Sequence, residues 1–351
     1  MNCGVGTAPT PLSAISGLVM AGWPARTGAP GRRVASPTML AAVAGGVGAA
    51  RLLRGLAAVA EPADMVAVVN TGDDLVLHGL HVSPDLDTIT YTLGGAVNAG
   101  QGWGLEGESW QVMASLERYG QGAPAGSSAG QTWFRLGDRD LATHLYRTQR
   151  LAEGASLTEA TAEIARAWGL GLRLLPMSDD AVQTRVTVAE GEIGFQDYFV
   201  ARRHAVAVEA VRFAGAEGAA PGPDVLATLA GAERIVICPS NPIVSIGPVL
   251  AVPGIRAALR ERRDDVVAVS PIVAGAALKG PAGRLLAELG HECSVVGVAR
   301  LYAPVAATLV IDEADRSLAG AVAAAGMRPV VAPAVMSGPA EAAALARVVL
   351  A

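Results

Sequence analysis

The fold of this chain can be inferred from one stretch, Met39-Leu-Ala-Ala-Val-Ala-Gly45-Gly46-Val-Gly48-Ala-Ala-Arg51-Leu. An apolar run ends in three glycines, and a helical pattern follows at once. Glycine lets the backbone approach a ligand closely, and a new helix points free N–H groups and its positive dipole end at an anion. The stretch therefore predicts a strand, a phosphate-sized turn and a helix. It matches neither the G-x-G-x-x-G fingerprint nor a P-loop, and a plain tight turn stays an alternative.

A second apolar run, Met65–Val69, ends in Asn70-Thr-Gly-Asp73-Asp74. Two neighbouring strand ends would then offer an anion cradle and a pair of carboxylates. A polyphosphate with a bound divalent cation suits both features. A helix cap or a solvated turn is the alternative interpretation of the Asp pair.

Composition limits the class of protein. The chain has 351 residues, half of them apolar, which is enough for one large α/β domain or two smaller ones. The net charge of −5 and the absence of a long basic run argue against nucleic acid as the main partner. Three cysteines without paired spacing fit a reducing cytoplasm and give no zinc pattern. No stretch has the roughly 18–20 uninterrupted apolar residues of a membrane span.

Residues 1–38 differ from the rest of the chain. They contain no Asp or Glu, several Pro and Gly, and only three charged side chains, Arg26, Arg32 and Arg33. We expect a flexible, dispensable extension, or a start site placed too early, with Met39 as the true initiator. The functional domain is then residues 39–351.

Strands and helices alternate after Met39, which predicts a doubly wound α/β fold with a mostly parallel, Rossmann-like sheet. Strands are predicted at Leu40–Ala44, Met65–Val69, Arg234–Cys238, Val266–Val269, Ser294–Val296, Thr308–Ile311 and Pro329–Val331. Helices are predicted at Ala49–Ala60, Gly254–Arg263, Ala282–Leu289, Asp315–Ala325 and Pro339–Leu350.

The middle of the chain has a different texture. Residues 85–215 are predicted to form a helical and β-hairpin insert between two parts of the α/β core, 39–84 and 225–351. Helices are expected at Asp85–Val97, Glu108–Tyr119 and Asp138–Leu151, and the capping box that begins at Ser156 opens a fourth. A hairpin is expected at Val182–Ala189 and Ile193–Val200, with a further strand within His204–Phe213. Such an insert typically covers a site at the carboxyl ends of the strands.

Acidic pairs recur at predicted element boundaries, and their hard oxygen ligands suit Mg²⁺. The pairs are Asp73/Asp74, Asp85/Asp87, Asp138/Asp140 and Asp179/Asp180. Helix capping is an equally simple role for the second and third pairs, and a turn for the last. His144 follows Asp140 by one helical turn, and from the residues alone a solvated surface position is the simpler interpretation.

The loop Cys238-Pro-Ser240-Asn241-Pro-Ile-Val-Ser245-Ile-Gly-Pro248 follows a predicted buried strand. Two prolines fix the loop, and its Ser and Asn side chains supply neutral hydrogen-bonding groups. Ser270-Pro-Ile repeats the pattern one strand later. Rigid loops with neutral donors fit recognition of a base or sugar, although a well-built turn explains them as well.

Taken in order, these motifs resemble the 2-phospho-L-lactate transferase family of coenzyme F-420 biosynthesis, over residue 39 to the C-terminus. The motifs are Gly45-Gly46-Val-Gly48-Ala-Ala-Arg51, Asn70-Thr-Gly-Asp73-Asp74, Pro84-Asp85-Leu-Asp87-Thr88, Gly102-Trp103-Gly104, Gly137-Asp138-Arg139-Asp140-Leu-Ala-Thr-His144, Ser178-Asp179-Asp180, Ser240-Asn241-Pro-Ile-Val-Ser245 and Ser270-Pro-Ile272. The family turn usually has glycine where this chain has Ala49.

The resemblance implies a reaction in which the ribityl hydroxyl of the deazaflavin Fo attacks the guanosine diphosphate ester of a phosphorylated three-carbon acid. GMP leaves, and a phosphodiester forms. It also implies a Mg²⁺ cofactor, a cytoplasmic homodimer, and small-molecule substrates with neither nucleic acid nor membrane as partner. Asp74 and Asp73 are the implied catalytic and metal-binding residues. The implied substrate-binding residues are Gly45, Gly46, Gly48, Asp85, Asp87, Asp138, Arg139, His144, Ser240, Asn241, Ser245 and Ser270.

Two other classes remain as alternatives. Regulators of the gluconeogenesis-factor type resemble this family in fold and bind nucleotide sugars without transfer chemistry. The motifs around Asp85 and Asp138 favour the transferases. A dinucleotide-dependent dehydrogenase is more distant, because the glycine spacing is wrong and the second strand does not end on a ribose-binding acid.

Overall fold

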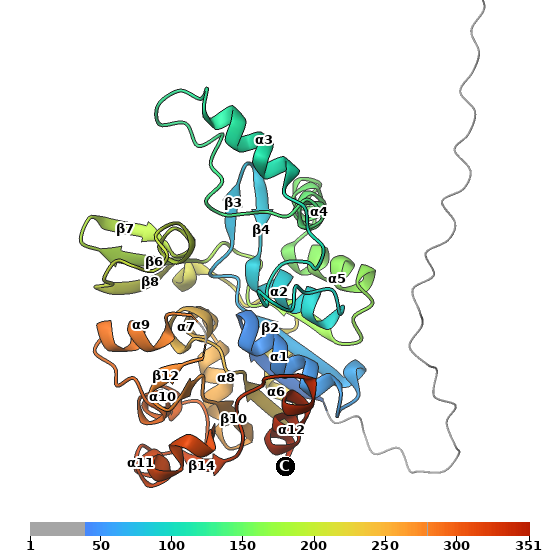
Figure 1. The fold of residues 1–351 in the computed structure, drawn as a ribbon. Helices are drawn as coiled ribbons and strands as arrows, with labels where there is room; N and C mark the ends of the chain where they lie inside the picture. The colour runs from blue at the N-terminus through green and yellow to red at the C-terminus, as the bar shows by residue number, and fades with distance from the viewer. Residues whose placement is uncertain (1–38, 279) are drawn as a thin grey trace, which may run out of the picture. The chain divides into compact units, whose positions relative to one another are not determined.

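The central sheet consists of seven parallel strands in the order β14-β13-β10-β9-β1-β2-β5. The structure, a computed structural model, describes residues 39–278 and 280–351, so the expectation for residues 1–38 lies outside the described residues. The strands are β1 (Leu40–Ala44), β2 (Met65–Val69), β5 (Arg173–Pro176), β9 (Arg234–Ile237), β10 (Val266–Val269), β13 (Thr308–Ile311) and β14 (Arg328–Val331). Together with the helices on its faces (Figure 1), this sheet confirms the predicted fold class.

Helices cover both faces of the sheet because its inner strands are apolar on both sides. Along β1, Ala41 and Val43 face one layer, whereas Leu40 and Ala42 face the other. The helices are α1 (Gly46–Ala57), α2 (Pro84–Leu93), α3 (Gln111–Gly120), α4 (Asp140–Ala152), α5 (Leu157–Ala167), α6 (Val225–Gly231), α7 (Gly247–Ala251), α8 (Ile255–Glu261), α9 (Ala282–Glu288), α10 (Val295–Tyr302), α11 (Ala319–Ala324) and α12 (Pro339–Leu350).

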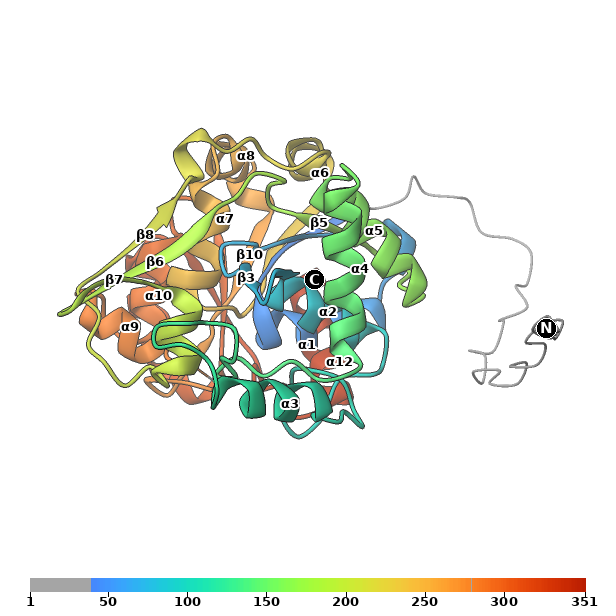
Figure 2. The ribbon, with the colours of Figure 1, turned by 90° about the horizontal axis from the view of Figure 1, so that it is seen from above.

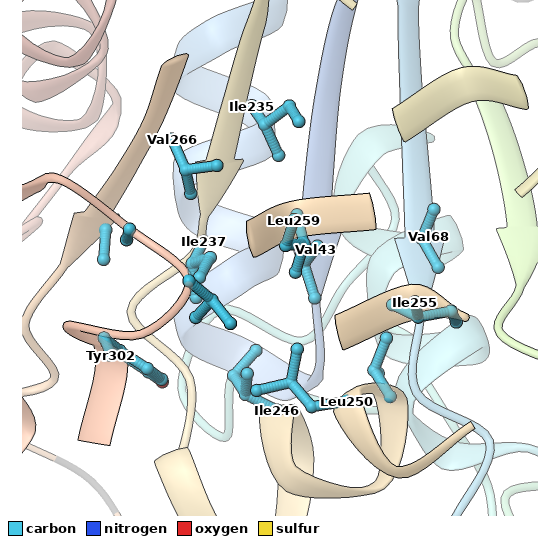
Figure 3. Packing of buried hydrophobic residues seen from close by; sticks show 14 of the residues in the cluster. Val43, Val68, Ile235, Ile237, Ile246, Leu250, Ile255, Leu259, Val266 and Tyr302 are labelled. Carbon is cyan, nitrogen blue, oxygen red and sulfur yellow. The ribbon is translucent and has the colours of Figure 1, made fainter. Parts of the chain in front are cut away.

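Each layer has its own hydrophobic core. On one face, Val43 and Ile235 pack with Leu250 of α7 and with Ile255 and Leu259 of α8 (Figure 3). On the other face, α1, α2 and α12 contribute side chains that are buried against β1 and β2: Leu52, Leu53, Leu56, Leu86, Ile89, Leu345 and Val349. Burying each such side chain contributes about 1.5–3 kcal/mol, so the two layers fix the strand ends firmly.

The segment between β2 and α6 forms most of the predicted insert. It contains a short hairpin, β3 (Leu75–Leu77) with β4 (Leu80–Val82), followed by α2 to α5. A second small sheet has the order β7-β6-β8, with β6 (Gln183–Val188), β7 (Gly191–Gly194) and β8 (Ala210–Ala214). Seen from above, α3, α4 and this small sheet surround β3 and α2 (Figure 2).

Shorter elements complete the chain. A two-stranded sheet pairs β11 (Ile272–Val273) with β12 (Ala276–Ala277). Single turns of tighter or wider helix occur at Pro62–Asp64, Asp197–Ala201, Ala216–Gly218, Pro242–Ile246, Arg263–Asp265 and Glu313–Leu318.

Four local predictions were wrong or incomplete. The predicted hairpin strand Ile193–Val200 is mostly not a strand, because β7 ends at Gly194 and a wide helical turn spans Asp197–Ala201. Ser294–Val296 is not a strand, because the Ser294 side chain accepts hydrogen bonds from the amides of Val296 and Gly297 and so caps α10. No strand was predicted at Arg173–Pro176, yet β5 pairs with β2 and extends the central sheet. The segment 85–215 therefore also contributes to the core. The hairpin β3–β4 was not predicted either.

No single helix among residues 39–278 and 280–351 is long and apolar enough to cross a membrane. Two helical segments, Pro242–Ala251 and Ile255–Glu261, reach that length and composition only when they are taken together, and they are bent by 94°.

Close packing of α1 on α12 depends on Gly55. A Cβ atom there would lie 2.3 Å from the carbonyl oxygen of Ala342. We expect Gly55→Ala to destabilise the protein by about 1–3 kcal/mol through overpacking. Gly320→Ala is the matched control, since Gly320 is also helical but has open space around it. The higher helix propensity of alanine should stabilise this control variant slightly, by up to about 1 kcal/mol.

Urea denaturation of both variants measures this difference. Equal stability of Gly55→Ala and the wild type would contradict the proposed packing constraint between α1 and α12.

Candidate active site at the carboxyl ends of the strands

The strand order reverses between β1 and β9. From β1 the chain builds outward through β2 and β5, and from β9 it builds the other way through β10, β13 and β14. Ligands of open α/β sheets bind in the crevice at such a switch point, beyond the carboxyl ends of the strands. Gly45 follows β1 there and Ser240 follows β9, and the Gly45 amide donates a hydrogen bond to Ser240 Oγ at 3.3 Å.

The glycine turn brings α1 very close to its neighbours. A Cβ atom on Gly45 would lie 2.8 Å from both Asp85 Oδ2 and Ser245 Cβ, and one on Gly48 would lie 2.1 Å from the carbonyl oxygen of Pro239. Gly46 has a φ of +71°, which favours glycine. The helix begins at Gly46, three residues earlier than predicted. The first-turn amides of Val47 and Gly48 have no acceptor within the helix and point their N–H groups out of its start.

Asp85 occupies part of this helix terminus. Its carboxylate accepts hydrogen bonds from the Gly46 amide and from Asn70 Nδ2, the latter at 2.9 Å. Asn70 Oδ1 in turn accepts from the Gly72 amide at 2.8 Å. The expected capping role of Asp85 is therefore replaced by a bridge between the glycine turn and the Asn70–Asp74 loop.

Asp73 and Asp74 lie beside this bridge, at the end of β2. Asp73 is buried, with its backbone carbonyl facing Gln196 Nε2, and Asp74 Oδ2 accepts a hydrogen bond from Ser83 Oγ at 2.6 Å. The Oδ1 atoms of both residues are buried without a hydrogen-bond partner among the described residues. Leaving two such acceptors unsatisfied is costly unless a ligand or cation completes the site.

The surroundings of these carboxylates raise their pKa values. Burial raises the pKa of Asp73 well above its usual range, and the neighbouring Asp85 and Asp74 charges raise it further. Burial also raises the pKa of Asp74, against the hydrogen bond from Ser83 and the charge of Arg147. Burial raises the pKa of Asp85 to about 6, with its hydrogen bonds from Asn70 and Gly46 acting in the opposite direction.

Helix α4 brings the principal countercharge to this region. Arg147 is only 2% exposed and forms a two-pronged ion pair with Asp87 through Nη1 and Nη2. His144, one turn earlier, lies with Nδ1 3.7 Å from Asp87 Oδ2 and Nε2 3.1 Å from Asp140 Oδ2. Asp140 also accepts a hydrogen bond from the Tyr91 hydroxyl at 2.5 Å. His144 is buried, so the expected surface position was wrong.

Asp138 and Arg139 do not join the carboxylate cluster. Asp138 is half-buried and caps α3, accepting hydrogen bonds from the Ser109 hydroxyl and from the amides of Gln111 and Val112. These bonds, chiefly the one from Ser109, lower its pKa. Arg139 Nη1 donates to the carbonyl oxygen of Glu106 at 2.6 Å. Both side chains therefore hold the loop before α4, and the residues from that motif that reach the cluster are Asp140 and His144.

The serine and asparagine side chains of the late loops have mostly local partners. Asn241 Oδ1 accepts from the amides of Ile243 and Val244, and Ser270 Oγ accepts from the Ile272 amide. Ser240 and Ser245 lie against Gly45 instead. The glycine turn thus contacts two of the four predicted residues directly.

A pocket of about 190 Å³ opens beside Asp73 and Asp74. Its other lining residues come from β3, β6, β7, the loops next to them and the loop between α3 and α4: Gly72, Leu75, Trp133, Gln183, Thr184, Arg185, Gly194, Phe195, Gln196 and Asp197. A larger cavity of about 440 Å³, lined by Phe213, Leu250 and Tyr302 among others, includes none of the clustered carboxylates.

Comparison with known proteins identifies the family. The family model described as 2-phospho-L-lactate transferase CofD matches residues 40–335. The chain belongs to this family. It is 44% identical over 318 residues to a phosphoenolpyruvate transferase of Kitasatospora aureofaciens, with 89% of this chain and 97% of that protein covered. A phosphoenolpyruvate transferase of Streptomyces griseus is 46% identical over 310 residues, with 87% and 95% covered.

Solved structures agree on the fold. A UPF0052 family member from Bacillus halodurans superposes with a TM-score of 0.56 at 15% identity, covering 90% of this chain and 99% of that one. The CofD family assignment makes this chain a phospho-acid transferase of coenzyme F-420 biosynthesis.

Sequence reasoning missed several residues of the site. Arg147 and Tyr91 were not singled out, because an arginine or tyrosine inside an amphipathic helix looks like an ordinary surface or core residue. Asn70 and Asp140 were noted only as parts of motifs. Heptad-like spacing offered one signal, since Asp140, His144 and Arg147 lie on one face of α4.

The raised pKa of Asp85 predicts a pH dependence of stability. From about pH 4 to 6 the folded state keeps a proton that the unfolded state releases, so stability falls as pH rises through this window. The loss is on the order of 3 kcal/mol. We expect Asp85→Asn, studied in a metal chelator, to have a flatter profile of melting temperature against pH. Asp264→Asn, whose side chain is 94% exposed, should keep the wild-type profile.

Proposed function

We propose that this protein transfers an enolpyruvate-type phosphorylated three-carbon acid from its guanosine diphosphate ester to the ribityl hydroxyl of Fo. The hydroxyl oxygen bonds to the acid-side phosphorus, the bond from that phosphorus to the bridging oxygen breaks, and GMP leaves with the electron pair. The hydroxyl proton passes to the Asp74 carboxylate. Family membership and the names of the relatives support this reaction, and they favour it over the regulatory alternative.

The proposal depends on the adjacent carboxylates of Asp73, which is buried, and Asp74, which is half-buried with a buried Oδ1 atom. Among residues 39–278 and 280–351, no group of three or more His, Cys, Asp or Glu side chains forms a ready-made metal site. Mg²⁺, however, usually takes only one or two protein carboxylates together with substrate phosphates and water. The two unpartnered, buried Oδ1 atoms fit that demand. Bound Mg²⁺ would neutralise charge on the phosphate oxygens as the phosphoryl group is transferred.

The other residues orient the two substrates. The guanylyl end of the donor is proposed to lie at the switch point, where the Val47 and Gly48 amides point outward and where Ser240 and Ser245 contact Gly45. The donor's acid-side phosphorus then lies over Asp73 and Asp74. Fo is proposed to lie beneath the insert with its ring system outside this pocket, against the aromatic face of Trp133 at the rim.

Arg147 and Asp87 act as positioning residues in this scheme. Their buried ion pair joins α4 to α2 and places a fixed positive charge behind Asp74. This fixed charge lowers the pKa of Asp74 against the effect of burial, and it does so without contacting substrate. In phosphoryl transfer such positioning and charge compensation are the main contributions of the protein.

Product formation tests the proposal directly. Purified protein is incubated with Mg²⁺, Fo and guanylylated phosphoenolpyruvate, and the products are weighed by mass spectrometry. Asp74→Asn keeps the side-chain shape and removes the charge, so we expect turnover to fall by at least about 10²-fold while the unfolding temperature is maintained.

Asp264→Asn is the matched control, because it removes an exposed carboxylate far along the chain from this site. Its turnover should equal that of the wild type. Near-normal turnover of Asp74→Asn would exclude the role given to this residue, and a wild type that makes no phosphodiester from any guanylylated acid would exclude the function itself.

A further inference from the structure

We propose that Arg185 binds the carboxylate of the transferred acid and thereby selects donors that carry one. The inference rests on the proposed function, because it assigns one end of the proposed donor to the pocket beside Asp73 and Asp74. The pocket contains a positive side chain that the phosphoryl-transfer scheme leaves without a role. That side chain is Arg185, near the start of β6.

The guanidinium of Arg185 is held in place from one side only. Its Nε donates to Glu192 Oε1 at 3.2 Å, and no hydrogen bond engages Nη1 or Nη2 within the described residues. A Cβ atom on Gly194 would lie 3.7 Å from Arg185 Nη1, so this nitrogen extends over another pocket-lining residue that has no side chain to block it. The side chain is 31% exposed, and water or a ligand can therefore reach its free edge.

The small sheet gives this region a surplus of positive charge. Arg185 and Arg212 are directly opposite each other on β6 and β8, and both pair with the single carboxylate of Glu192. Two arginines against one glutamate leave a net charge of +1. Arg212 is 59% exposed and does not line the pocket, so Arg185 is the positive side chain that a ligand there can reach. Asp197 also lines the pocket, and its carboxylate lies 3.6 Å from Arg202 Nε.

The size and position of the pocket fit the acid end of the donor. Sites for drug-sized ligands usually enclose about 300–1,000 Å³. A pocket of about 190 Å³ suits a three-carbon acid better than the fused rings of a deazaflavin. Because Asp73 and Asp74 form one wall, an acid bound there has its phosphorus next to the proposed metal site. A planar guanidinium is the side chain best suited to a carboxylate.

The test compares donors with and without a carboxylate. The first donor is guanylylated phosphoenolpyruvate or 2-phospholactate, and the second is the guanosine diphosphate ester of propan-2-ol, in which a methyl group replaces the carboxylate of lactate. Calorimetric titration gives the dissociation constant for each donor, and the transfer assay gives kcat/KM. We expect Arg185→Gln to weaken the carboxylate donors about 10–100-fold, as for loss of a charge-assisted hydrogen bond, and to leave the propan-2-ol donor unchanged.

Arg212→Gln is the matched control, since it removes the other partner of Glu192 outside the pocket. It should keep the wild-type preference for a carboxylate. Equal losses on both kinds of donor, no loss on either, or an Arg212→Gln variant as impaired as Arg185→Gln would overturn the assignment. A wild type that binds carboxylate donors through Arg185 but forms no product would contradict the proposed function and still support this inference.

Discussion

Three neighbouring carboxylates, those of the buried Asp73 and Asp85 and of the half-buried Asp74, set the constraint that governs this structure. Desolvation raises the pKa of all three carboxyl groups, and neighbouring carboxylates raise the pKa of Asp73 and Asp74 further, so the fold has to compensate for these charges or leave the groups protonated. Part of the compensation comes from the N-terminus of α1 and from Asn70, which donate to Asp85. The positive charge of Arg147 provides further compensation, but Arg147 is already paired with Asp87. The net charge that remains at this carboxylate cluster is negative.

That net charge explains why a nucleotide ester and a cation belong together here. The start of α1 is an anion site by its dipole, but Asp85 already takes one of its amides. A diphosphate placed against the remaining amides would face three carboxylates and would be repelled without a cation between them. Gly45 and Gly48 make the arrangement possible, because any side chain there would displace Asp85, Ser245 or the Pro239 carbonyl. The close approach of the backbone at the glycine turn and the position of the carboxylates therefore depend on each other.

The sequence predicted the parts of the site that follow from strand ends. Apolar strands followed by Gly45, Asp73 and Ser240 have to meet at one edge of a parallel sheet, and they do. No comparable rule predicts which side chains of the insert contact one another. The Arg147–Asp87 ion pair joins residues that are 60 positions apart in the sequence. The Asp138 side chain caps the start of α3 and therefore does not join the carboxylate cluster. Ser294 likewise caps a helix. The homodimer and the cytoplasmic location stay predictions.

Direct binding of Mg²⁺ to the substrate-free protein is the measurement that tests the central claim most closely. Isothermal titration of the wild type, of the double variant Asp73→Asn with Asp74→Asn, and of Asp264→Asn separates the effect of this carboxylate pair from that of an exposed surface charge. The account predicts one saturable Mg²⁺ site in the wild type and in Asp264→Asn, and its loss in the double variant with the fold retained. A double variant that binds Mg²⁺ as the wild type does, or a wild type whose unfolding temperature does not respond to Mg²⁺, would contradict it.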